Sequence, residues 1–75
     1  MLRTGVSSSD LQSVGYDATT CTLEIKFHSG GIYQYFKVAE AIYRGLMAAY
    51  SHGKYFHAYI KDLYSSQKIA LKTAH

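Results

Sequence analysis

The stretch CTLEIKFHSGGIYQYFKV, residues 21–38, contains the pattern that decides the fold. In its first half, leucine, isoleucine and phenylalanine alternate with glutamate, lysine and histidine, a period of two that is typical of a strand with one buried face. Two adjacent glycines follow, and they permit the positive φ angles of a tight hairpin. The stretch therefore predicts an antiparallel pair of strands over residues 21–28 and 32–38.

One more strand is expected before this hairpin, and two helices are expected after it. Residues 11–17 repeat the period of two. Over residues 40–50 apolar side chains recur at helical spacing, and a second helix over residues 54–64 has a similar apolar stripe. The predicted fold class is α+β, with a three-stranded antiparallel meander followed by two helices packed on one face.

A chain of 75 residues allows one small domain. We expect a flexible N-terminus over residues 1–7, a domain over residues 8–64, and a basic C-terminal helix extension or tail over residues 65–75. The hydrophobic content of 48% excludes a charge-rich disordered chain. We find neither an apolar run of the roughly 18 residues that a membrane span needs nor a signal peptide, so we expect a cytoplasmic protein that does not contact a membrane.

Four blocks stand out in order along the chain. They are SSDLQSVGYD at residues 8–17, TLEIKF at 22–27, GGIYQY at 30–35 and SHGKYF at 51–56. Their residues, order and spacing resemble those of the KTSC domain family. The family is named from the C-terminus of some lysyl-tRNA synthetases and also occurs alone in bacterial and phage proteins. The resemblance implies the family's fold, no established activity, and a suggested role in RNA binding.

Two tyrosines and a lysine on the last predicted strand are candidate ligand contacts. Tyr33, Tyr35 and Lys37 are two residues apart in turn, so they share one face of the strand. Flat rings beside a cation can stack on nucleobases. The same rings can instead pack beneath the helices while Gln34 faces water, and the sequence leaves both interpretations open.

Cationic side chains gather in the last third of the chain, where residues 51–75 carry four lysines against one aspartate. Lys54, His57 and Lys61 lie on one side of the second predicted helix, and Arg44 lies on the outer face of the first. Such side chains can contact phosphates, which position a nucleic acid without reading its sequence. The alternative is a solvated, solubilising helix face.

Tyr43, Met47 and Tyr50 follow one edge of the first predicted helix and are candidate interface residues, because Met and Tyr are enriched at interfaces. The alternative is that they form the outer margin of the core. A domain of this size with a single cysteine has no internal disulfide and buries little surface. Self-association would add stability, so we expect a homo-oligomer.

Catalytic and metal-binding patterns find little support in the sequence. Cys21 and His28 are seven apart on one strand and face opposite sides, so they do not form a nucleophile pair. We therefore expect no enzyme, no cofactor and no metal site. The expected function is a small binding module for RNA or a nucleotide-like anion. The alternative is a protein–protein interaction module, either an adaptor or a phage-type inhibitor or sponge acting as an oligomer.

Overall fold

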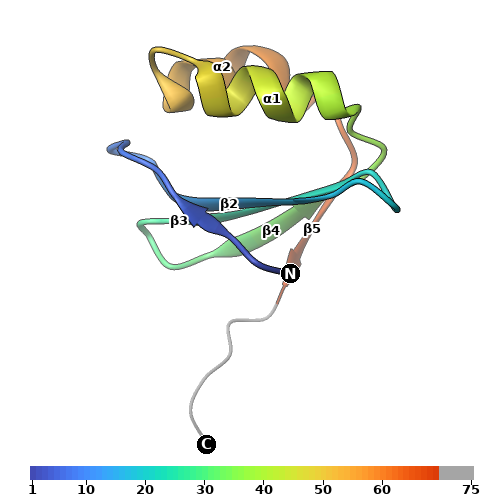
Figure 1. Cartoon of the computed structure of the whole chain (residues 1–75). Helices are drawn as coiled ribbons and strands as arrows, with labels where there is room; N and C mark the ends of the chain where they lie inside the picture. The colour runs from blue at the N-terminus through green and yellow to red at the C-terminus, as the bar shows by residue number, and fades with distance from the viewer. Residues whose placement is uncertain (70–75) are drawn as a thin grey trace, which may run out of the picture.

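Within residues 1–69, five antiparallel strands form one sheet in the order in which they occur along the chain, and two helices lie over one face of it (Figure 1). The computed structural model describes residues 1–69. The elements are β1 (Thr4–Gly5), β2 (Leu11–Asp17), β3 (Thr22–Phe27), β4 (Ile32–Tyr35), α1 (Glu40–Ala48), α2 (His52–Tyr59) and β5 (Ser66–Ile69). The predicted α+β class is confirmed, whereas the prediction of three strands is wrong.

The two strands missing from the prediction lie at the two edges of the sheet. β1 falls within residues 1–7, where a flexible N-terminus was expected, and pairs Thr4 with Val14. β5 falls within residues 65–75, where a helix extension or tail was expected, and pairs with β4 from Tyr35↔Ser66 to Ile32↔Ile69. Residues 70–75 of that tail lie outside the described residues. Both strands are short and largely exposed, so they carry no hydrophobic alternation that the sequence could reveal. Backbone pairing with β2 and with β4 holds them in the sheet.

The core lies between the helices and the sheet face that they cover. Residues directly opposite each other on neighbouring strands share a face, so Leu23 and Ile25 of β3 lie on the same side as Tyr35 and Tyr33 of β4. The buried hydrophobic residues are Leu11, Val14, Leu23, Ile25, Tyr35, Val38, Leu46, Phe56 and Ile60. Burial of these side chains is the main source of stability.

The helix α2 is shorter than predicted, and the turns at its two ends are well defined. The backbone amide of Lys54 donates to the Ser51 hydroxyl at 3.2 Å, which caps the first turn of α2. The helix ends at Tyr59, before the predicted end at residue 64. Asp62 then adopts a left-handed conformation with φ 64°, within the turn that leads the chain back to the sheet at β5.

The N-terminal segment crosses the sheet face that the helices leave uncovered. A Cβ atom at Gly15 would collide with the carbonyl oxygen of Leu2, so this crossing requires glycine there. Arg3 pairs with the buried carboxylate of Glu24, and its Nε donates to Ser13 Oγ at 3.1 Å. The crossing therefore brings the Arg3 guanidinium group to the carboxylate of Glu24 and neutralises its negative charge. Neither helix within residues 1–69 is long and apolar enough to span a membrane.

Candidate ligand-binding site

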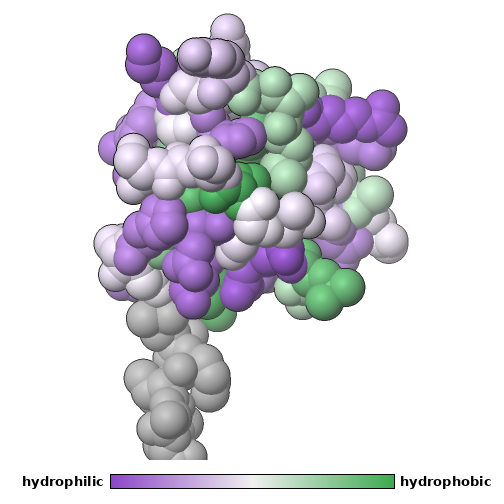
Figure 2. Space-filling view, turned by 60° about the vertical axis from the view of Figure 1, so that its left-hand side comes forward, coloured by the Kyte–Doolittle hydropathy of each residue, from purple (hydrophilic) through white to green (hydrophobic). Residues whose placement is uncertain are grey.

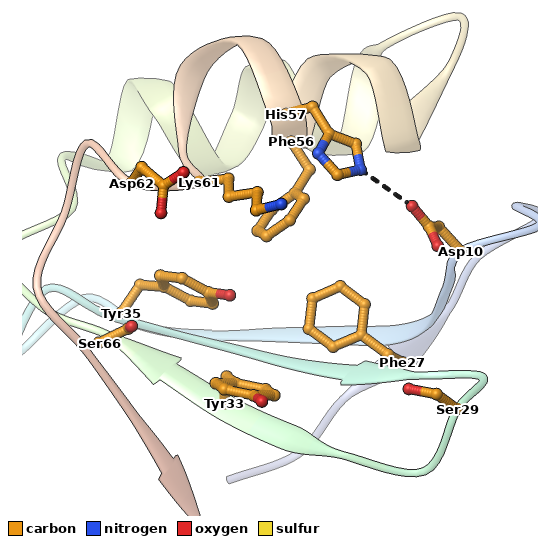
Figure 3. A pocket seen from close by; sticks show the side chains of 10 residues that line it. All are labelled: Asp10, Phe27, Ser29, Tyr33, Tyr35, Phe56, His57, Lys61, Asp62 and Ser66. Carbon is orange, nitrogen blue, oxygen red and sulfur yellow. Dashed lines mark hydrogen bonds and ion pairs between the residues drawn. The ribbon is translucent and has the colours of Figure 1, made fainter.

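A pocket of about 350 Å³ opens between α2 and the sheet, and aromatic rings form its walls (Figure 3). Phe27, Tyr33 and Tyr35 come from the sheet, and Phe56 comes from α2. The rings meet edge to face, with centroids 5.3 Å apart for Phe27 and Phe56 and 5.6 Å apart for Tyr35 and Phe56. The rings therefore form the inner wall of this aromatic pocket, where they belong to the core or pack against it. In the view of Figure 2, hydrophobic surface shows as a strip between hydrophilic side chains.

Charged and polar side chains surround the opening of the aromatic pocket. His57 Nε2 of α2 lies 3.1 Å from Asp10 Oδ2, in the loop before β2. Lys61 and Asp62 come from the turn after α2, and Figure 3 shows the Lys61 ammonium group extending into the space between helix and sheet. Ser29 and Ser66 add hydroxyl groups. The opening thus carries a cation, two carboxylates and a histidine within reach of one ligand.

Tyr35 contributes its hydroxyl group to the pocket rather than the face of its ring. The residue is only 6% exposed, so its ring is part of the core. Burial raises the pKa of Tyr35 to about 12, and the neighbouring Tyr33 and Asp62 add to the shift. Like an ordinary tyrosine, the phenol keeps its proton at neutral pH and can donate a hydrogen bond. Tyr33 is half-buried and leaves more of its ring open.

Four of the seven predicted binding residues meet at the aromatic pocket, namely Tyr33, Tyr35, His57 and Lys61. They come from β4, from α2 and from the turn that follows α2. The two interpretations of Tyr33 and Tyr35, core packing and ligand contact, are compatible in the fold. Both rings pack against the core, as the alternative interpretation held, and both also line the pocket.

The other three predicted binding residues lie elsewhere. Lys37 is exposed beyond the end of β4, in a left-handed conformation with φ 59°, so it does not continue the strand face of the tyrosines. Arg44 is exposed on α1 and pairs with Glu40 at 3.0 Å. Lys54 lines a neighbouring hollow at the start of α2.

The predicted interface strip on α1 is largely occupied by packing inside the molecule. The ring of Tyr43 stacks on Tyr16, with centroids 4.8 Å apart and an interplanar angle of 9°. Met47 is half-buried against the core. Tyr50, beyond the end of α1, is fully exposed and is the one member of the strip that stays free for a partner.

Sequence reasoning missed several residues of the pocket, because they come together only in the fold. Phe27 belongs to the alternating pattern of residues 21–28 and Phe56 to the apolar stripe of residues 54–64, and both face the core, but nothing in the sequence places them beside one another. Asp10 is 47 positions from His57 in the chain, and no local pattern links the two. Among residues 1–69, no group of three or more His, Cys, Asp or Glu side chains is arranged to hold a metal ion.

Comparison with known proteins agrees with the resemblance seen in the sequence. The model of the KTSC domain family matches residues 7–64. The chain belongs to the KTSC domain family. A crystal structure of a KTSC domain protein from Yersinia pestis is similar, with a TM-score of 0.89 and 41% sequence identity. That similarity covers 91% of this KTSC chain and 96% of the Yersinia chain.

Two kinds of curated relative carry a similar KTSC domain. A lysine–tRNA ligase from Nostoc is 39% identical over 62 residues, which are 83% of this chain and 11% of the ligase. An uncharacterized protein from Stutzerimonas stutzeri is 38% identical over 61 residues, which are 81% of this chain and 86% of that protein. The KTSC chain thus spans a small part of the ligase and most of the Stutzerimonas protein.

Proposed function

We propose that this KTSC protein is a non-enzymatic binding module that takes a nucleotide-like anion, or one nucleotide of an RNA chain, into the aromatic pocket. The observation that carries the proposal is the convergence of Tyr33, Tyr35, His57 and Lys61 on one preformed pocket. The occurrence of a related domain in a lysine–tRNA ligase, an enzyme that handles RNA, supports it further. The proposal places the protein in the cytoplasm, where it meets such ligands.

The size and walls of the aromatic pocket suit one flat ring. Its volume of about 350 Å³ is within the range of small-molecule sites, and four of its ten lining residues are phenylalanine or tyrosine. Phe27 and Tyr33 are half-buried and have ring surface left for a ligand. A nucleobase would stack or pack edge-on against these rings, at about 1–3 kcal/mol per base.

The charges around the pocket favour a nucleotide over inorganic phosphate. Lys61 can bind a phosphate oxygen, and the histidine beside it can add a second contact. Asp10 and Asp62 repel a bare phosphate, but their carboxylate oxygens accept hydrogen bonds from the amino groups at a base edge. A ligand with a donor-bearing base and a phosphate satisfies both kinds of group.

Calorimetric titration of nucleoside monophosphates at low salt tests the proposal. We expect Lys61→Ala to weaken binding about tenfold, because a charge-assisted hydrogen bond is lost. Lys26→Ala is the charge-matched control, because Lys26 lies on the uncovered face of the sheet, outside the pocket. Failure to bind any nucleotide at low salt would reject the proposal, as would binding that Lys61→Ala and Tyr33→Leu both leave unchanged.

Protein–protein interaction is a second candidate, and the exposed ring of Tyr50 favours it. Exposed tyrosines are common at interfaces, and a domain of this size gains stability from a partner or from a second copy. Sedimentation over a range of concentrations tests the homo-oligomer. A dimer that Tyr50→Ser dissociates would support this candidate, and a monomer at every concentration would count against self-association.

A further inference from the structure

Three hollows follow one another around α2 and share residues where they meet. The aromatic pocket shares Asp10 and His57 with a hollow of about 360 Å³ at the start of α2, which we call the serine hollow. The serine hollow shares Tyr50, Ser51 and Lys54 with a third hollow of about 520 Å³, which we call the tyrosine groove. The three therefore form one continuous path along the surface.

Exposed rings dominate the tyrosine groove. Tyr50 is 108% exposed and Tyr59 is 54% exposed. A third tyrosine, Tyr55, also lines the groove. The centroid of its ring lies 4.7 Å from that of Tyr59, and its hydroxyl group packs against Gly45 of α1. The groove thus offers ring surface of Tyr50 and Tyr59 that the core does not use, beside the Tyr55 ring that packs against α1.

The charge of the tyrosine groove matches a polyanion. Of the seven described residues that line it, Lys54 is the only one with a charged side chain. Open aromatic faces next to a cation are the combination with which proteins hold single-stranded nucleic acids. A basic protein with a formal charge of +3 adds a weak, general attraction for the same ligand.

We infer that the three hollows form one track for a short single-stranded RNA. One base occupies the aromatic pocket, the backbone passes Lys61 and Lys54, and the following bases stack on Tyr50 and Tyr59. With one base in the pocket and one on each of the rings of Tyr50 and Tyr59, the track holds about three nucleotides. This inference rests on the proposed function and adds the ligand's length and its second contact surface.

Fluorescence anisotropy with labelled oligoadenylates of one to six nucleotides tests the track. We expect affinity to rise steeply up to about three nucleotides and to level off beyond that length. Replacing both Tyr50 and Tyr59 by Ala should weaken trinucleotide binding at least about tenfold and leave mononucleotide binding unchanged. Phenylalanine at both positions should restore trinucleotide binding, because the stacking ring is kept.

Leu63→Ala is the matched control, because Leu63 is 65% exposed and lies outside all three hollows. If the alanine variant at Tyr50 and Tyr59 binds trinucleotides normally while Lys61→Ala weakens mononucleotides, the track is wrong and the proposed function stands. If neither mononucleotides nor oligonucleotides bind, both fail. A purified protein partner that needs Tyr50 and binds in the presence of nuclease would also overturn the track.

Discussion

At Gly15 the N-terminus of the chain crosses the sheet, and the absence of a side chain there permits the crossing. An alanine Cβ would strike the Leu2 carbonyl group, so Gly15→Ala should lift the N-terminal segment and separate Arg3 from Glu24. A buried carboxylate without its cation costs about 1–3 kcal/mol or more, and we expect a loss of that size in urea unfolding.

Gly5→Ala is the matched control for this variant. Its Cβ would meet only the Gln12 carbonyl oxygen at 3.9 Å, which is an ordinary contact. Equal stability losses at the two glycines would show that the crossing at Gly15 is not the cause.

The protonation of Tyr35 links stability to alkaline pH. Folding raises its pKa from 10.0 to about 12, so the folded state holds the phenol proton more tightly than the unfolded state does. The resulting stabilisation is complete below pH 10 and is lost as the pH rises to about 12. A shift of this size corresponds to the order of 2–3 kcal/mol.

Tyr35→Phe should remove about half of the alkaline loss of stability, which urea unfolding between about pH 9 and about pH 12 measures. A comparable loss should remain in the variant, because burial and the neighbouring Cys21 raise the pKa of Tyr16 to about 12 as well. An unchanged decline in the variant would mean that Tyr35 is not a source of the alkaline sensitivity.

Among the secondary-structure elements, the sequence predicts the strands and helices whose apolar residues recur at the spacing of their buried face. Residues 11–17 were predicted as a strand and form β2 with the same bounds. The helix α1 starts at Glu40 as predicted, because the apolar spacing changes there. β5 could not be predicted in this way, since three of its four residues are exposed and no alternation marks it.

β5 is held by its backbone pairing with β4, and proline substitutions can test this pairing. The Phe36 amide donates to the Ser65 carbonyl at 2.9 Å, so by the alternation of an antiparallel ladder the amide of Gln67 faces β4 and that of Lys68 faces outward. Gln67→Pro should therefore cost about 1–3 kcal/mol and speed hydrogen exchange in β4.

Lys68→Pro should be tolerated, because it removes an amide that faces away from β4 and has no partner strand among residues 1–69. Thermal unfolding of the two variants side by side makes the comparison. Equal destabilisation by both would argue against the register of β5 on β4.

At the scale of the whole molecule, the candidate site could be predicted only in part. Sequence spacing placed His57 and Lys61 on one helix side and the two tyrosines on one strand face, and all four line the pocket. Their meeting depends on how α2 lies over β4, which periodicity does not encode. The same limit explains why Tyr50 and Tyr59 were not grouped, since the turn between α1 and α2 brings them to one groove.

Salt dependence is the property of the whole molecule that best separates the track from general attraction to a basic surface. Each phosphate contact on a single strand contributes about −0.7 to the slope of log K against log salt. Two lysines along the track, Lys54 and Lys61, predict a slope of about −1.4 for a trinucleotide. Removing either lysine should make the slope shallower by about 0.7, whereas Lys26→Ala should not change it. If the slope stays at about −1.4 when both lysines are replaced, the salt dependence arises from cations outside the track, such as Lys37 and Arg44, and RNA would then bind across the outer surface rather than around α2.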